Sequence, residues 1–500
     1  MQGLHIVDIL ILFLYAGGML GLGWFYSRRQ RTVDEYFVGN RSMNSYMIGI
    51  SLYATLLSTI TYLSTPGEMI SKGPVVIAGW ASIPIAYVVI AYGLIPVFMK
   101  YRVTSAYEIL EMRLGVGARL TGAVMFIALR LIWMSLLIYF ASKALLAILD
   151  LEDGWLFAVT LGTGVVAITY STLGGLRAVV VTDMVQFILL FGGAVLVIVM
   201  VTVELGGFSW FPTEWDPNWD EQPLFSFDPH VRASVFGFIL MGTAWNICTA
   251  GADQTVIQRF MATSDAKSAR RSFLIKSIAG VVVATLLAFV GLALSGYFQA
   301  FPEQLPAGKT IDDADLLFPH FISHQLPPGI AGLVVSGMFA AAMSSIDSGV
   351  NSISAVVTTD FVGRFSVGNV SDKLRVRLAR IVALTVGLIV VGASTYMQYV
   401  PGNFLAMSKR TSSLFVAPLF ILFFIGLFVP FRTQVGAIIG SLASAATAIL
   451  IAFWSEITGL EPVSFMWITF SAFVVGATVG CLASLATSPS RRIEGKQVEG

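Results

Sequence analysis

Cysteine is scarce in this sequence. Its 500 residues include two cysteines, Cys248 and Cys481, and both lie in apolar runs. Two cysteines so far apart provide neither a disulfide framework nor the spacing of a metal site. We therefore expect both to be buried as small hydrophobic side chains.

Charge is scarce as well. Charged residues make up 12% of the chain and the net charge is +1, whereas 56% of the residues are apolar and the mean hydropathy is +0.81. The near-zero charge gives no electrostatic reason to expect a nucleic-acid partner. The apolar content exceeds what the core of a soluble protein requires. It indicates an all-α integral membrane protein surrounded by a lipid bilayer.

Two motifs of nucleotide and metal enzymes are absent. The segment Ala307–Thr310 reads AGKT, but Glu303 stands where the phosphate-binding loop requires its first glycine. The zinc-binding pattern HExxH does not occur. The missing phosphate-binding loop argues against an ATP-driven pump, and we expect a transport protein that performs no covalent chemistry.

Long apolar runs fill most of the chain. Thirteen of them are long enough to span a membrane as helices. They comprise residues 4–26, 45–71, 75–99, 121–149, 154–173, 179–204, 232–256, 274–300, 329–361, 379–400, 412–429, 434–456 and 463–487. An odd number of spans places the two ends of the chain on opposite sides of the membrane.

Lysine and arginine are concentrated in alternate connections between these runs. The basic connections lie within residues 28–41, 100–119, 177, 259–276, 364–380, 432 and 491–496. Since cytoplasmic loops carry the excess of positive charge, we predict a multi-pass protein of the cell membrane with its N-terminus outside and its C-terminus in the cytoplasm. Arg259 is thereby assigned to a cytoplasmic connection.

Polar side chains interrupt the run at 329–361. On a helix, four of its serines fall within one arc of about 100°: Ser344, Ser345, Ser348 and Ser352. Asp347 extends this arc, and Asp183 is expected at a similar depth on another helix. Serines alone could equally bond to their own helix. Two intramembrane carboxylates favour a site for a hard monovalent cation, which prefers oxygen ligands.

Two further runs carry signs of broken helices. Residues Ile50–Gly67 are dense in serine and threonine and end in Pro66-Gly67, and the sequence MGTAWNICTAGADQ interrupts the run at 232–256. A helix unwound at its centre exposes carbonyl groups to an ion and hydroxyl groups to a solute. Interruptions in two places are typical of secondary transporters built from inverted repeats.

Arg130 lies near the middle of the run at 121–149, in FIALRLIWM. It is about 13 Å from the start of that helix. An arginine at this depth must pair with a carboxylate or face water. It either balances an internal acid or binds an anionic solute through two parallel hydrogen bonds.

Five segments resemble the sodium:solute symporter family, which includes sodium/glucose cotransporters, monocarboxylate carriers and bacterial sialic acid transporters. They are DEYFVGNRSM (Asp34–Met43), TSAYEILEMRLG (Thr104–Gly115), YSTLGGLRAVVVTDMVQ (Tyr170–Gln186), ADQTVIQRFMAT (Ala252–Thr263) and FAAAMSSIDSGVNS (Phe339–Ser352). The resemblance covers nearly the whole chain and is nearest to the sialic acid group.

The resemblance implies a leucine-transporter-type fold with about 13 transmembrane helices. Its parts are an extra helix and linker (1–44), two inverted five-helix repeats (45–204 and 232–429), two further helices (430–487) and a cytoplasmic tail (488–500). It also implies three sets of binding residues. A main Na⁺ site uses the carbonyls of Ala54, Leu57 and Ala341 and the hydroxyls of Ser344 and Ser345. A second Na⁺ site uses Asp183, Ser345, Asp347 and Ser348. The solute lies near Leu56, Ser58, Thr61 and Arg130.

These inferences predict a Na⁺-coupled symporter, functional as a monomer, that imports a small organic solute, with an organic anion of the sialic acid or monocarboxylate type expected. Three alternatives stay open. One is a proton-coupled carrier that uses Asp347 or Asp183 as the proton acceptor, and another is a sugar or amino-acid carrier of the same fold. The third is a membrane sensor, although only about a dozen polar residues follow Thr487 in this sequence.

Overall fold

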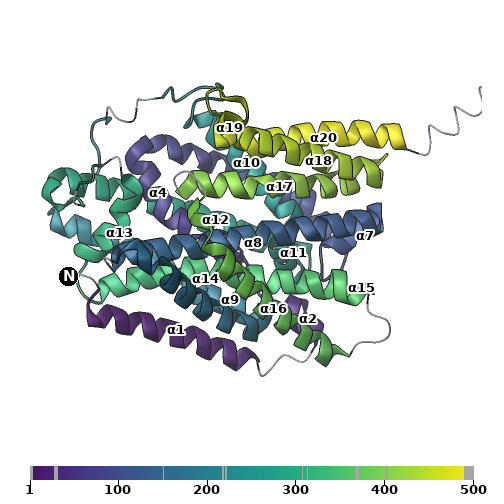
Figure 1. Cartoon of the computed structure of the whole chain (residues 1–500), viewed down its shortest axis with the longest axis horizontal. Coiled ribbons are helices and arrows are strands. Elements are labelled where there is room, and N and C mark those ends of the chain that lie inside the picture. Colours follow the sequence, from purple (N-terminus) through teal and green to yellow (C-terminus); the bar gives the residue numbers. More distant parts are fainter. Residues whose placement is uncertain are drawn as a thin grey trace, which may run out of the picture.

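The computed structural model describes most of the chain. It covers residues 4–27, 32–149, 151–216, 219, 222–306, 308–311, 313–365, 371–399 and 404–488. Within these residues all the regular structure is helical. The helices form an elongated bundle and run mostly along its long axis (Figure 1).

The described residues of the first half of the chain form nine α-helices. They are α1 (Ile6–Ser27), α2 (Val33–Val38), α3 (Ser45–Leu56), α4 (Thr59–Lys72), α5 (Ser82–Val88), α6 (Ile95–Phe98), α7 (Tyr107–Leu114), α8 (Val116–Ile148) and α9 (Leu156–Glu204). The second half continues with α10 (Val235–Ala252), α11 (Gln254–Met261), α12 (Ala266–Ala300), α13 (Ala314–His324), α14 (Ile330–Val356), α15 (Gly363–Phe365), α16 (Asp372–Ser394), α17 (Phe404–Phe428), α18 (Gln434–Ala452), α19 (Trp454–Thr458) and α20 (Ile468–Thr487).

Eleven helical stretches of the described chain are long and apolar enough to cross a membrane, and two shorter apolar helices, Ser45–Leu56 and Leu156–Val166, accompany them. The predicted number of thirteen spans is therefore not confirmed. One reason is that the predicted span 45–71 is two helices, the second of which begins a long stretch from Thr59 to Phe98. Another is that two predicted spans lie within α9, which bends at Gly175 (φ 56°, ψ −175°), a conformation that glycine adopts without a steric penalty.

Both predicted helix breaks are confirmed. Leu57 and Ser58 have extended backbone between α3 and α4, and the Ser58 hydroxyl caps α4 by accepting from the N–H of Thr61. Asp253 is extended between α10 and α11, and its carboxylate accepts from the N–H of Thr255. A short polar side chain satisfies an otherwise unpaired N–H group in the first turn of a helix. Each break therefore carries its own cap.

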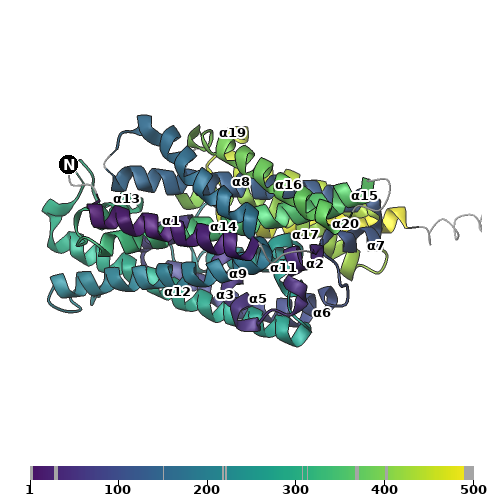
Figure 2. The ribbon, with the colours of Figure 1, turned by 90° about the horizontal axis from the view of Figure 1, so that it is seen from below.

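Helix α14 lies inside the bundle. It packs against α1, α3, α8, α9 and α16, and nearly all its side chains are buried. Figures 1 and 2 show α14 beside α1 and α9 in both views. The outer surface is apolar, with Phe13 and Leu14 on α1 about 70% exposed. A buried polar helix within an apolar exterior suits a pathway through a bilayer.

Candidate ion and solute site

The serines of α14 meet the break between α3 and α4. The Ser345 hydroxyl lies 2.8 Å from the carbonyl oxygen of Thr55 and 3.2 Å from that of Leu57, and it donates to them. These carbonyls lack a helical partner because the helix ends there. A small void beside the break is lined by Ala54, Leu57, Ala341 and Ser344. The structure thus brings the five residues predicted for the main Na⁺ site to one place.

Asp183 on α9 faces the same serines. Its side chain is fully buried, and its Oδ1 accepts from the Ser344 hydroxyl. Its Oδ2 accepts from the Ser51 hydroxyl and from Nη2 of Arg259, which is 3.2 Å away. The expectation that Asp183 lies at the depth of the α14 serines agrees with these contacts.

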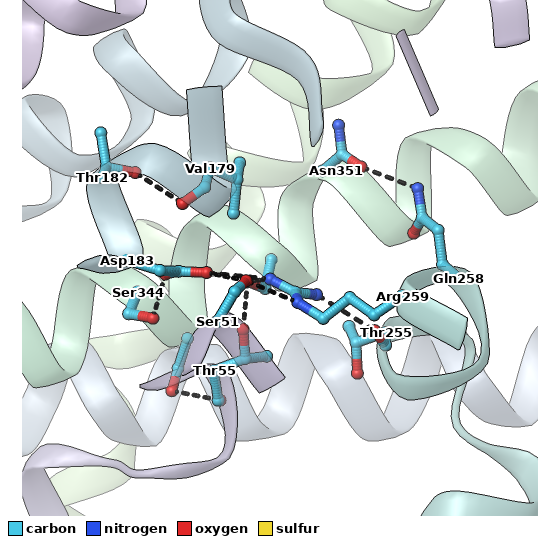
Figure 3. Close-up of polar contacts among 12 residues, drawn as sticks. Ser51, Thr55, Val179, Thr182, Asp183, Thr255, Gln258, Arg259, Ser344 and Asn351 are labelled. Atoms are coloured by element: carbon cyan, nitrogen blue, oxygen red, sulfur yellow. Dashed lines mark hydrogen bonds and ion pairs between the residues drawn. The ribbon is translucent and has the colours of Figure 1, made fainter. Parts of the chain in front are cut away.

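Arg259 occupies the centre of this polar cluster, as Figure 3 shows. Its Nε donates to Ser51 at 2.9 Å, Nη1 to the carbonyl of Thr255 at 3.0 Å, and Nη2 to Ser348 at 2.6 Å. None of its side chain is exposed. Its assignment to a cytoplasmic connection is wrong, because α11 returns the chain to the interior after the break at Asp253.

The residues predicted for a second Na⁺ site share neighbours, because Ser348 hydrogen-bonds to the Thr55 hydroxyl at 2.8 Å and Ser345 donates to the Thr55 carbonyl at 2.8 Å. Asp183 and Ser348 share the Arg259 guanidinium, whereas Ser345 contacts the carbonyls at the helix break. Asp347 is fully buried, and both Asp347 and Asp183 interact electrostatically with Tyr15 of α1. Successive helical residues point in different directions, so Asp347 and Ser348 face different neighbours.

The polar face of α14 continues along α11. The Ser352 hydroxyl donates to Oε1 of Gln258 at 2.8 Å, and Nε2 of Gln258 donates to Oδ1 of Asn351 at 2.9 Å and to the carbonyl of Phe37. Figure 3 shows Gln258 and Arg259 on α11 reaching toward α14. The C-terminal part of the predicted serine arc, Ser348 and Ser352, therefore contacts α11, whereas Ser344 and Ser345 contact α9 and the α3–α4 break.

A cavity of about 140 Å³ lies next to the α3–α4 break. Three of the four predicted solute residues, Leu56, Thr61 and Arg130, line it. Its other lining residues are Thr55, Ile60, Leu129, Trp133, Trp245, Thr249, Asp253, Ser408, Ser412 and Val416. Ser58 is buried beside the cavity and serves instead as the cap of α4.

Arg130 pairs with an internal acid. Its Nη2 forms an ion pair with Asp253 and donates to the Thr255 hydroxyl at 2.7 Å. Its side chain is 5% exposed, and its Nε has no hydrogen-bond partner among the described residues. The first of the two predicted roles, balance of an internal acid, is thus seen, and one buried donor remains for a ligand.

Sequence reasoning did not identify Ser51, Thr55, Asp253, Thr255 or Arg259 as site residues. One signal was available for the last three. Asp253 lies at the end of the interruption MGTAWNICTAGADQ, Thr255 and Arg259 follow it, and an acid at a helix break is a common cap. When the cap lies inside the bundle, an arginine on the short helix that follows it also lies inside the bundle. A prediction from apolar runs assigns such a polar helix to a loop between membrane spans.

Comparisons with known proteins agree with this architecture. The profile of the sodium:solute symporter family matches residues 36–444. A sodium/sialic acid symporter of Proteus mirabilis is 29% identical over 469 residues, which are 90% of each chain. The human sodium-coupled monocarboxylate transporter 1 is 28% identical over 435 residues, 86% of this chain and 70% of that protein.

A solved structure also matches over nearly the full length. It is a Na⁺-coupled sialic acid symporter in a substrate-bound outward-open state, with a TM-score of 0.82 and 28% identity, and the match covers 97% of this chain and 99% of that one. This match confirms the expected leucine-transporter-type fold.

Proposed function

Since the chain belongs to the sodium:solute symporter family, we propose that it is a secondary active symporter that couples Na⁺ to the import of a small organic anion. One observation carries this proposal. Ser344 and Ser345 meet the α3–α4 break, and the same break borders the cavity lined by Arg130. An ion and a solute would therefore bind to one interrupted helix.

The chemistry of the proposed ion site suits Na⁺. The candidate ligands are neutral oxygens: the carbonyls of Ala54, Leu57 and Ala341 and two hydroxyls. A hydroxyl has one hydrogen and two lone pairs. Ser345 now directs its hydrogen to carbonyls at the break, and a bound ion requires this hydrogen to turn away. Asp183, one hydrogen bond behind Ser344, supplies negative charge close to the ion.

Coupling follows from the shared helix break. Leu57 belongs to the proposed ion site, whereas Leu56 and Thr61 line the cavity. Na⁺ that orders the break also orders these cavity residues. The solute then binds more tightly in the presence of Na⁺, and by reciprocity Na⁺ binds more tightly in the presence of solute.

The cavity favours a small anion. Nε of Arg130 and the Thr249 hydroxyl are buried without hydrogen-bond partners among the described residues, and both side chains line the cavity. A solute carboxylate would accept from both. The volume of about 140 Å³ is close to that of cavities that hold one benzene-sized molecule. This size supports a monocarboxylate, whereas a sialic acid requires the cavity to widen.

We also propose how the chain lies in the membrane. The basic connections support a cytoplasmic C-terminus and an outer N-terminus. The two breaks, between α3 and α4 and between α10 and α11, lie near the starts of residues 45–204 and 232–429. Such corresponding interruptions support an assignment of these ranges as the inverted repeats. We expect a monomer to be sufficient for transport.

Uptake by proteoliposomes tests the proposal. Radiolabelled monocarboxylates, a sialic acid, a neutral sugar and an amino acid are each offered with an inward Na⁺ gradient, with choline in place of Na⁺, and at two pH values. We expect Na⁺-driven, electrogenic uptake of a monocarboxylate. Uptake that follows the proton gradient in choline would favour the proton-coupled alternative. Uptake of a neutral solute alone would contradict the anion assignment.

A further inference from the structure

Two histidines lie one helical turn apart on α13. His320 and His324 stand at positions i and i+4, and their rings stack with centroids 4.2 Å apart and planes inclined by 27°. Side chains four residues apart lie on the same face of a helix. The chain has four histidines, and the other two, His5 and His230, precede α1 and α10.

Each of the two rings has one nitrogen bonded to a backbone carbonyl. Nε2 of His320 lies 3.0 Å from the carbonyl oxygen of Gln304, and Nδ1 of His324 lies 3.2 Å from that of His320. A carbonyl oxygen can only accept, so both of these nitrogens carry a hydrogen. In the neutral rings the opposite nitrogens, Nδ1 of His320 and Nε2 of His324, therefore each hold a lone pair.

This arrangement is typical of histidines that bind metals. A metal-binding histidine commonly donates its other ring N–H to a carbonyl or carboxylate, which fixes the tautomer and the ring orientation. The Ser323 hydroxyl also supports His324, at 2.7 Å from its Nδ1. Burial, and then the neighbouring His324, lower the pKa of His320. His320 is therefore neutral at neutral pH, as a metal ligand must be.

We propose that His320 and His324 together bind a divalent transition-metal ion of the Zn²⁺ class at the outer end of the molecule. Imidazole suits Zn²⁺, Ni²⁺ and Cu²⁺, whereas Mg²⁺ and Ca²⁺ prefer oxygen ligands. Among the described residues, no group of three or more His, Cys, Asp or Glu side chains could hold a metal ion. Water therefore completes the coordination, as in open zinc sites.

The site is accessible from solution. Helix α13 lies at the end of the bundle where α1 begins (Figures 1 and 2), which is the outer end in the proposed orientation. One side of α13 is buried in the bundle through Leu317, Phe318 and Phe321. His324 is exposed and His320 is half-buried, so an ion from outside can reach both rings.

A bound ion would hold α13 in position. The charge on a metal-bound imidazole strengthens its other N–H as a donor, so the bond from His320 to Gln304 tightens. Gln304 also accepts from Nε2 of Gln325, just after α13, at 2.8 Å. Both contacts fasten α13 to the connection that leads from α12.

Helix α13 in turn packs on α4, the helix that follows the α3–α4 break. The Phe318 ring lies 5.5 Å from the Tyr62 ring of α4. Because α4 borders the solute cavity and alternating access requires such elements to move, we expect bound Zn²⁺ to slow transport. This effect rests on the proposed symport, whereas the metal site itself does not.

Metal titrations of the full chain, purified without a histidine tag, test the site. Calorimetry in detergent should show one Zn²⁺ per chain, and Zn²⁺ but not Mg²⁺ should raise the melting temperature. His324→Ala and His320→Gln should each lower the Zn²⁺ affinity by about tenfold or more, because each removes one of two protein ligands. His230→Ala, at an exposed histidine elsewhere, is the control and should bind as the wild type does. Equal affinity in His324→Ala and the wild type would overturn the inference.

Uptake by right-side-out membrane vesicles tests the effect on transport. With outside Zn²⁺ at about ten times its Kd, solute uptake should slow by up to about tenfold, since binding to one conformation favours it by about that factor. Chelation by EDTA should restore the rate, and His324→Ala should transport equally with and without Zn²⁺. Equal slowing of both proteins, or no slowing of the wild type, would overturn the control of transport. Uptake that ignores Na⁺ would instead contradict the proposed symport and leave the metal titration as an independent result.

Discussion

Ser344 and Ser345 are adjacent in the chain but form hydrogen bonds with different partners. The Ser344 hydroxyl donates to Asp183 on α9, and the Ser345 hydroxyl donates to carbonyls at the α3–α4 break. Neighbouring residues of a helix point about 100° apart, so two successive serines can contact two different helices. We propose that a cation between them would receive a lone pair from each.

Removal of either hydroxyl should weaken Na⁺ activation. We expect Ser344→Ala and Ser345→Ala each to raise the Na⁺ concentration for half-maximal transport by about tenfold to a hundredfold. A hydrogen bond to a charged group is worth about 1.5–3 kcal/mol, and loss of an oxygen ligand from Na⁺ should be comparable. Na⁺ titrations of solute uptake in proteoliposomes measure the effect.

Two serines of the same helix provide the control. Ser336 and Ser354 are fully buried, and each donates at 2.8 Å to a carbonyl of its own helix. Ser336→Ala and Ser354→Ala should leave the Na⁺ titration unchanged. If all four alanine variants behaved alike, the serines of α14 would have a packing role and the ion site would lie elsewhere.

Nη2 of Arg130 pairs with Asp253, whereas Nε has no hydrogen-bond partner in the part of the chain that the structure describes. Arg130→Lys retains the charge that Asp253 requires but loses the planar fork of the guanidinium. We expect solute affinity to fall by about tenfold to a hundredfold, the equivalent of one charged hydrogen bond. Na⁺ binding without solute should change little. Thermal shifts titrated with solute and with Na⁺ separate the two effects.

One outcome would assign Arg130 a structural role alone. If Arg130→Lys binds the monocarboxylate as tightly as the wild type, the arginine serves as the counter-ion of Asp253. Thr249→Val offers an independent check, because the Thr249 hydroxyl lines the same cavity without a partner in the described structure. It removes a second proposed solute contact and no charge.

At the scale of elements, a carboxylate on α1 bonds to the start of α14. Oδ1 of Asp8 accepts from the backbone N–H groups of Gly329 and Gly332, both at 2.7 Å, and Asp8 is 2% exposed. These N–H groups lie at the start of α14, where no helical partner exists. A negative charge there also interacts favourably with the helix dipole. Asp8 thus helps to dock the first helix onto the helix that carries the proposed ion site, together with the contact between Tyr15 and Met343.

Loss of this carboxylate should destabilise the protein. We expect Asp8→Ala to lower the free energy of unfolding by about 1.5–3 kcal/mol, because two buried N–H groups lose a charged acceptor. Thermal unfolding in detergent measures the change. Asp8→Asn keeps one acceptor oxygen and should fall between Asp8→Ala and the wild type. A melting temperature equal for all three proteins would mean that α1 docks through apolar contacts alone.

At the scale of the whole molecule, α1 begins at one end of the bundle and α20 finishes at the other (Figure 1). This arrangement suits a chain whose ends lie on opposite sides of a membrane. The basic residues select which side is cytoplasmic. A fluorescent protein fused to the C-terminus should therefore fluoresce, and alkaline phosphatase fused there should be inactive. Active phosphatase at that end would reverse the orientation.

The sequence by itself determined the membrane class, the two helix breaks and the polar face of α14. These features depend on hydropathy and helical periodicity, which are properties of short segments. The breaks at Leu57 and Asp253 were visible because polar residues and glycine gather there. Asp183 was placed beside the α14 serines because depth along a helix follows from residue count at a constant rise.

Only the tertiary structure decided which charges pair. Arg259 was taken as a loop residue, yet it lies buried against Asp183, 76 residues away in the chain. Arg130 was expected to pair with a carboxylate or to face water, and its partner Asp253 is separated from it by 123 residues. Hydropathy and periodicity carry no information about such distant partners, because an ion pair forms wherever packing brings two buried charges together. The same pairing decided that the oxygens expected to bind a second Na⁺ already face an arginine.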